Sequence, residues 1–165
     1  MMSQRLEQIW NHPVYREIYQ VLTIYEKDRE FCRHGMDHFL DVARIAYIRN
    51  LEAGLGLEKD LIYAAALLHD IGKAVQYQNG IGHEKAGAYI AENILDDMGP
   101  GLAFSESDKK RIIAAIESHR DGEGNTDPLG RLLYESDKLS RKCYLCEARK
   151  ECNWSDDKKN KGIEV

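Results

Sequence analysis

The 165-residue chain lacks the features that define several large classes of protein. No stretch approaches the roughly 18 consecutive apolar residues that can span a bilayer, and the first residues contain no apolar signal region. Basic residues are not in excess, because the formal net charge is −5. We therefore expect a cytoplasmic protein with no membrane partner and no broad nucleic-acid surface.

Proline is scarce, with three residues, and no run of alternating polar and apolar residues bounded by turns is present. Apolar residues instead recur at steps of three and four, which is the spacing of a helix face. The fold class expected is all-α, a single helical bundle of about six or more helices over residues 1–152. A polar, frayed tail is expected at 153–165.

The apolar pattern places helices near residues 4–27, 37–53, 60–69 and 83–98, with two more beginning near 105 and 127. Pro13 interrupts the first, so two helices or one broken helix are expected there. Ser105 and Asp127 have the side chains of N-terminal caps, and Pro128 suits a first helical position. Gly72 is expected to end the third helix, with loops at 74–82 and 121–127.

A histidine and an aspartate lie side by side at the end of an apolar run, at His69 and Asp70. An imidazole and a carboxylate together suit Mn, Fe or Zn better than a site of pure oxygen or pure sulfur. Further metal-competent side chains fall at helix starts, helix ends or inward faces: His38, His83, His119 and Asp137. Because bundles build metal sites from facing helices, these residues predict a divalent metal site.

Three segments together resemble the HD-domain metal-dependent phosphohydrolase superfamily, over roughly residues 30–142. They are His38-Phe39-Leu40-Asp41-Val42-Ala43-Arg44, His69-Asp70-Ile71-Gly72-Lys73 and Ser136-Asp137-Lys138-Leu139. The resemblance implies that one metal ion is held by His38, His69, Asp70 and Asp137.

Some HD families add two histidines between the His-Asp pair and the last aspartate, and bind two metals. His83 and His119 match those positions, which implies a binuclear site bridged by Asp70; the metal is Fe, Mn, Mg, Co or Zn. The segment after His119 partly resembles the HD-GYP branch, which degrades cyclic dinucleotides, but it lacks the Gly-Tyr-Pro triplet. The added histidines also resemble those of the branch that splits diadenosine tetraphosphate.

The expected function is hydrolysis of a phosphomonoester or phosphodiester, most simply a nucleotide or dinucleotide, by a metal-activated water. Asp70 and Lys73 are the expected catalytic residues, and Lys73 and Arg33 are expected to bind substrate phosphate. Two alternatives stay open: a non-catalytic metal-containing module that binds nucleotides or senses redox state, and a diiron oxygenase of HD type. A small phosphorylated substrate is the expected partner, and a homodimer is also considered.

Four cysteines lie outside the HD pattern: Cys32, Cys143, Cys146 and Cys152. The C-x2-C spacing is common among metal ligands, and the four thiols predict a zinc site or an iron–sulfur cluster. The two cysteine regions would meet if His38 and Asp137 meet, since each region lies six residues from one of these ligands. Reduced, partly buried thiols without a metal are the alternative.

Overall fold

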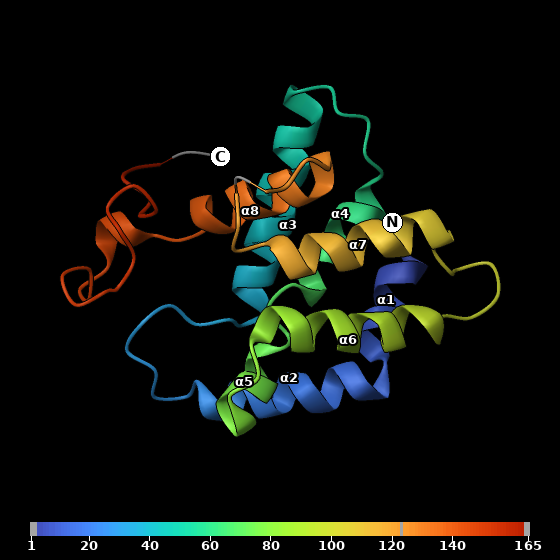
Figure 1. Ribbon diagram of the computed structural model, residues 1–165, viewed down its shortest axis with the longest axis horizontal. Coiled ribbons are helices and arrows are strands. Elements are labelled where there is room, and N and C mark those ends of the chain that lie inside the picture. Colours follow the sequence, from blue (N-terminus) through green and yellow to red (C-terminus); the bar gives the residue numbers. More distant parts are fainter. Residues whose placement is uncertain (1–2, 123, 164–165) are drawn as a thin grey trace.

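The computed structural model describes residues 3–122 and 124–163, and all regular secondary structure within them is helical (Figure 1). The helices are α1 (Gln4–Asn11), α2 (Pro13–Tyr25), α3 (Met36–Glu52), α4 (Lys59–Leu68), α5 (Lys73–Asn79), α6 (His83–Asp96), α7 (Glu106–Ser118), α8 (Pro128–Leu139) and a 3₁₀ turn at Cys143–Leu145. The all-α prediction is confirmed. Positions 1–2 of the predicted domain, 123 of the predicted loop and 164–165 of the predicted tail lie outside the described residues. None of the described helices has the length and apolar character that a bilayer span requires.

Helix starts follow the predicted local signals. Pro13 separates α1 from α2, and the His12 side chain accepts a hydrogen bond from the Val14 amide at 3.3 Å. At α8, the Asp127 carboxylate accepts from the Leu129 amide at 2.8 Å. The Ser105 hydroxyl caps α7 in the same way. These caps satisfy amides that a helix leaves without partners at its first turn.

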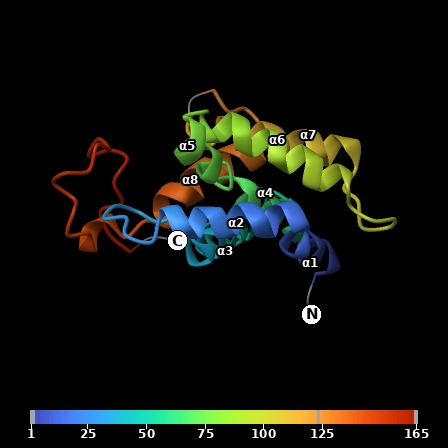
Figure 2. The same ribbon diagram turned by 90° about the horizontal axis from the view of Figure 1, so that it is seen from below.

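Helix α4 forms the centre of the fold, between a layer that contains α6 and α7 and a layer that contains α1, α2 and α3 (Figure 2). Seven of its ten residues are buried. A helix that is apolar nearly all round is stable only when neighbours cover every side. The end of α4 is therefore held deep inside the protein, and it carries the His-Asp pair.

The segment 73–79 forms helix α5, so the prediction of a loop at 74–82 is wrong for these residues. Helix α4 ends at Leu68, before the predicted stop at Gly72; a turn spans residues 69–72, and α5 begins at Lys73. A Cβ at Gly72 would lie 2.1 Å from the His83 carbonyl oxygen and 2.5 Å from the Gly87 amide nitrogen. Gly72 thus lets the chain turn against the start of α6 and resume helical geometry at once.

Two irregular segments, 26–35 and 140–163, form what we call the outer wall, at the end of the bundle where α2 and α8 finish (Figures 1 and 2). A guanidinium nitrogen of Arg141 donates to the Arg33 carbonyl at 2.7 Å and joins the two segments. The Asn160 amide donates to the Leu139 carbonyl at 3.0 Å. This hydrogen bond joins the region predicted as a tail to the end of α8.

Candidate metal centre

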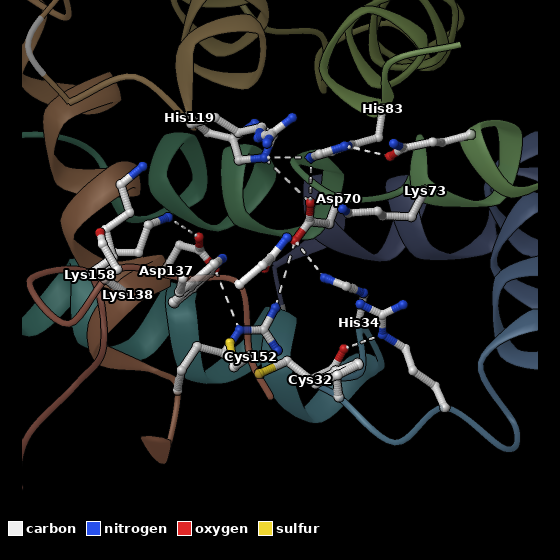
Figure 3. A pocket seen from close by; sticks show the side chains of 18 of the residues that line it. Cys32, His34, Asp70, Lys73, His83, His119, Asp137, Lys138, Cys152 and Lys158 are labelled. Carbon is white, nitrogen blue, oxygen red and sulfur yellow. Dashed lines mark hydrogen bonds and ion pairs between the residues drawn. The ribbon is translucent and has the colours of Figure 1, made fainter. Parts of the chain in front are cut away.

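Six side chains converge where helices begin or end. They are His38 in the first turn of α3, His69 capping α4 with Asp70 beside it, His83 opening α6, His119 capping α7, and Asp137 within α8. All six are buried. Facing helices thus bring residues far apart in the sequence to one place. Figure 3 shows Asp70, His83, His119 and Asp137 of this set.

The first group of potential ligands comprises His38, His69, Asp70 and Asp137, whose ligand atoms lie within 4.8 Å of one another. Nε2 of His38 lies 3.3 Å from Oδ1 of Asp137 and 3.5 Å from Oδ2 of Asp70. Nε2 of His69 lies 3.0 Å from Oδ2 of Asp70 and 3.9 Å from Oδ1 of Asp137. Two imidazoles and two carboxylates around a common point are a suitable donor set for a divalent transition metal.

The second group comprises Asp70, His83 and His119. Oδ1 of Asp70 lies 3.3 Å from Nε2 of His83 and 3.4 Å from Nε2 of His119. The two imidazole Nε2 atoms are 3.2 Å apart. Asp70 therefore belongs to both groups, with Oδ2 facing the first and Oδ1 facing the second. Figure 3 shows Asp70 beside His83 and His119.

Hydrogen bonds on the outer side of the rings set the histidine tautomers. His69 and His119 each hydrogen-bond through Nδ1 to the backbone carbonyl three residues earlier. Nδ1 of His83 lies 2.8 Å from Oε1 of Gln76. Because a carbonyl oxygen only accepts, Nδ1 is the donor in these pairs, and Nε2 of a neutral ring presents a lone pair to the site. Metal-binding histidines are oriented in this way.

The residues present fit a metal ion. The lone pairs on Nε2 of His83 and His119 face each other and an Asp70 oxygen, an arrangement that is repulsive without a cation among them. In the first group, Nε2 of His69 and Oδ1 of Asp137 are buried and lack a hydrogen-bond partner among the described residues. Buried polar atoms without partners are costly, and a divalent ion would satisfy both groups.

Both aspartates are held in the ionised form. Burial raises the pKa of Asp70, but the His69 and His34 rings in their protonated form outweigh that effect, and the pKa lies well below its usual range. Burial also raises the pKa of Asp137, but the nearby His38 and His69 rings and the Lys138 ammonium outweigh that effect, and the pKa again lies well below its usual range. The centre therefore offers two buried negative charges to a cation.

The centre opens into a pocket of about 660 Å³. Its lining includes six cationic side chains: Arg29, Lys73, Arg120, Lys138, Arg141 and Lys158. The acidic lining residues are the two aspartates of the centre and Glu151. An acidic chain thus concentrates positive charge at one pocket, which attracts anions.

Of the two cations expected to bind substrate, one lines this pocket. Lys73, at the start of α5, lies beside Asp70 (Figure 3). Burial lowers the pKa of the Lys73 amine, while the Asp70 charge acts in the opposite direction. Arg33 is exposed, and its Nε donates to the Arg29 carbonyl at 3.3 Å. Arg33 is not among the described residues that line the pocket, whereas Arg29, from the same irregular segment, is.

Two buried side chains at the centre were not among the predicted site residues. Nη2 of Arg141 lies 2.8 Å from Nε2 of His38 and 3.9 Å from Oδ2 of Asp70. Arg141 follows Asp137 by four residues, a spacing that directs both toward one side of α8 and its continuation. His34 lies 3.8 Å from Asp70 but belongs to an irregular segment, where helical spacing carries no signal.

The cysteines lie next to the metal centre rather than in it. All four are free thiols. Cys32, Cys143 and Cys146 line a second cavity of about 310 Å³, and Cys32 and Cys152 also line the main pocket (Figure 3). Within the described residues, the two histidine–aspartate groups are the sets of three or more potential ligands that lie within 4.8 Å, so no three of the sulfur atoms come that close together.

Relatives of the chain were found by sequence. An uncharacterised protein from Clostridium beijerinckii is 46% identical over 136 residues, which are 82% of this chain and 83% of that protein. Ribonuclease Y from Acetivibrio thermocellus is 28% identical over 129 residues, which are 78% of this chain and 22% of that enzyme. The chain thus spans about a fifth of Ribonuclease Y.

The fold has a counterpart among solved structures. The crystal structure of a predicted HD superfamily hydrolase from an uncultured Thermotogales bacterium aligns with a TM-score of 0.62 and 24% identity, covering 93% of this chain and 86% of that one. The HD domain family model matches residues 35–142, the range that contains all six potential ligands. The chain belongs to the HD domain family, as its histidine and aspartate motifs predicted.

Proposed function

We propose that this chain hydrolyses phosphate esters of a small anionic molecule, with nucleotides or dinucleotides as the substrate class. The observation that carries the proposal is the convergence of four imidazole Nε2 atoms and two buried carboxylates at the edge of a cation-lined pocket. HD superfamily hydrolases are generally metal-dependent phosphohydrolases, which supports the same chemistry.

The two ligand groups would each hold a divalent ion, with Oδ2 of Asp70 completing the first group and Oδ1 completing the second. Such ions supply an activated water and positive charge for phosphoryl transfer. Asp70 would fix the distance between the two groups, because one carboxylate has an oxygen in each. The histidines on α6 and α7 are held toward it by their own Nδ1 hydrogen bonds.

The cationic side chains would bind and orient the substrate phosphate. Lys73 lies at the Asp70 side of the pocket, where its ammonium would contact a phosphate oxygen and stabilise charge that develops in the transition state. Lys138 lies at the opposite side, with Nζ 2.6 Å from Oδ2 of Asp137. These two groups flank the centre (Figure 3) and suit a phosphate bound between them.

The outer wall would contact the rest of the substrate. Trp154 lines the pocket, and Nζ of Lys138 lies 5.0 Å from its ring centroid. An indole ring provides a flat surface on which a nucleobase can stack, and Lys158 adds a positive charge nearby. A base and more than one phosphate therefore match the groups available better than inorganic phosphate alone does.

The test is a hydrolysis screen of nucleotides and dinucleotides with Mn, Fe, Co or Mg, alongside metal analysis of the purified protein. We expect phosphate or nucleotide release that disappears with a chelator and in Asp70→Asn. Bound metal without turnover across the whole panel would contradict the proposal and favour a binding module. Oxygen consumption with ferrous iron, without phosphate release, would favour a diiron oxygenase.

The similarity to Ribonuclease Y favours a second candidate substrate, the phosphodiester of a short RNA. The net charge of −5 argues against a long polyanion along the surface, so contact would be confined to the pocket. End-labelled RNA oligonucleotides belong in the same screen. If these oligonucleotides are hydrolysed faster than free dinucleotides are, RNA is the preferred substrate.

A further inference from the structure

All four cysteines of the chain gather at the outer wall, although one precedes α3 and three follow α8. Cys32 is common to the two cavities: Cys143 and Cys146 line one with it, and Cys152 lines the other. Burial raises the pKa of Cys32, and the proximity of the other three thiols raises it further. The fold therefore brings every thiol of the protein to one region.

The C-terminal part of the outer wall has little apolar material to hold it in place. Within residues 140–163 the buried hydrophobic side chains are Cys143 and Ala148, and the regular structure is one short 3₁₀ turn. Small irregular units that cannot bury a core are usually fastened by disulfides or a structural metal. The four cysteines are free thiols, so a bound metal is the cross-link that their side chains could provide.

The local geometry and charge suit a thiolate site. Cys143 begins the 3₁₀ turn, and the Cys146 amide donates back to the Cys143 carbonyl at 3.2 Å, so the C-x2-C pair lies on one tight turn. Arg141 and Lys142 line the same cavity, together with Glu30 and Asp41, and the two cations would offset part of the negative charge of thiolates. Burial raises the pKa of Cys32, while the Arg141 charge lowers it.

We propose that Cys32, Cys143, Cys146 and Cys152 bind a structural zinc ion that fastens residues 140–163 to the segment 26–35. Four thiolates form a closed tetrahedral site with no position for substrate, which is the character of a structural zinc. Zinc bonds to sulfur of about 2.3 Å would bring the sulfur atoms within roughly 3.8 Å of one another. Apart from the 3₁₀ turn both segments are irregular, so an approach of the sulfur atoms would move backbone outside the α-helices.

This zinc would also act on the pocket. Arg141 donates to the carbonyl of Arg33, next to Cys32, and its other terminal nitrogen lies near His38. Trp154 and Lys158 follow Cys152 closely in the chain and line the main pocket. Fastening the cysteines would thus hold the substrate-contacting side of the pocket against the metal centre.

Metal stoichiometry of two variants tests the proposal without reference to activity. Asp70→Asn removes the carboxylate shared by both histidine–aspartate groups, so we expect it to lose the metals of the centre and retain one zinc per chain. Cys143→Ser combined with Cys146→Ser should lose that zinc and keep the metals of the centre. Equal zinc content in the cysteine variant and the unaltered protein would overturn the assignment.

A measurement on the unaltered protein covers the case in which the cysteine variant does not fold. Cobalt exchanged into the protein should give a sulfur-to-cobalt charge-transfer band, and stepwise mercurial modification of the four thiols should release zinc in proportion. Acid-labile sulfide with iron would show a cluster in place of zinc, and fewer than four titratable thiols under denaturing, non-reducing conditions would show a disulfide. Either result overturns the proposal and leaves the proposed hydrolysis to its own test.

Discussion

The metal centre and the outer wall face each other across one pocket, but they are positioned by different means. The ligands of the centre lie on or beside the ends of α3, α4, α6 and α7 and inside α8, and all of them are buried. The outer wall carries mainly exposed or half-buried side chains on irregular backbone. The potential metal ligands are therefore positioned by helix packing, while the residues proposed to contact substrate are held by a few hydrogen bonds and, on our proposal, by the cysteines.

This difference implies that substitutions should act differently on the two sides. Changes in the centre should affect metal binding or folding, because buried ligands and their supports have no freedom to rearrange. Changes in the outer wall should alter substrate affinity and leave metal content unaffected. The variants below test that division, in order of expected effect.

Asp70→Asn should have the largest effect, because its two oxygens serve both ligand groups. Removing the charge should lower kcat/KM by at least about 10³-fold, the scale of losing a main electrostatic contributor. Metal content of the centre should fall with it. Asp96→Asn is the matched control, since that side chain is exposed and pairs with Lys109. Substantial activity in metal-replete Asp70→Asn would contradict the assigned role.

Gly72→Ala should reduce stability more than a typical surface change, because the new Cβ meets backbone atoms of His83 and Gly87 rather than a movable side chain. We expect a loss of about 3 kcal/mol in the free energy of unfolding, measured by denaturant titration. Gly162→Ala is the control, since nothing lies within 4 Å of its added Cβ. An unchanged midpoint for Gly72→Ala would show that α5 and α6 can separate without cost.

These two residues also show what could be predicted from sequence. The place of Asp70 in the candidate metal centre was predictable because a His-Asp pair is typical of metal ligands, and helical periodicity placed it at a helix end. The close approach at Gly72 was not predictable, because it depends on which backbone packs against the turn. Helix α5 was missed because its start also depends on how the turn at Gly72 packs against α6, which the local sequence does not show. The role of the outer wall in lining the pocket was missed because polar, irregular residues carry no periodic signal.

Gln76→Ala should weaken metal binding in the second group without removing a ligand. Its Oε1 orients His83 through Nδ1, and loss of such a support typically costs 10–100-fold in metal affinity or activity. Calorimetric titration with Mn or Co would measure the metal affinity of the second group. Gln78→Ala, on the same helix but exposed, is the control. Equal affinities in the two variants would show that other contacts orient His83.

Lys158→Ala should have the smallest effect and should move KM rather than kcat. The side chain lines the pocket from the outer wall and is exposed, so its contact with a substrate phosphate should contribute about 1 kcal/mol, or roughly five-fold in KM. Lys161→Ala, an exposed lysine outside the lining, should leave KM unchanged. Metal content should be normal in both variants. A fall in kcat or in bound metal for Lys158→Ala would show that the outer wall also supports the chemical step, and the division between the two regions would then fail.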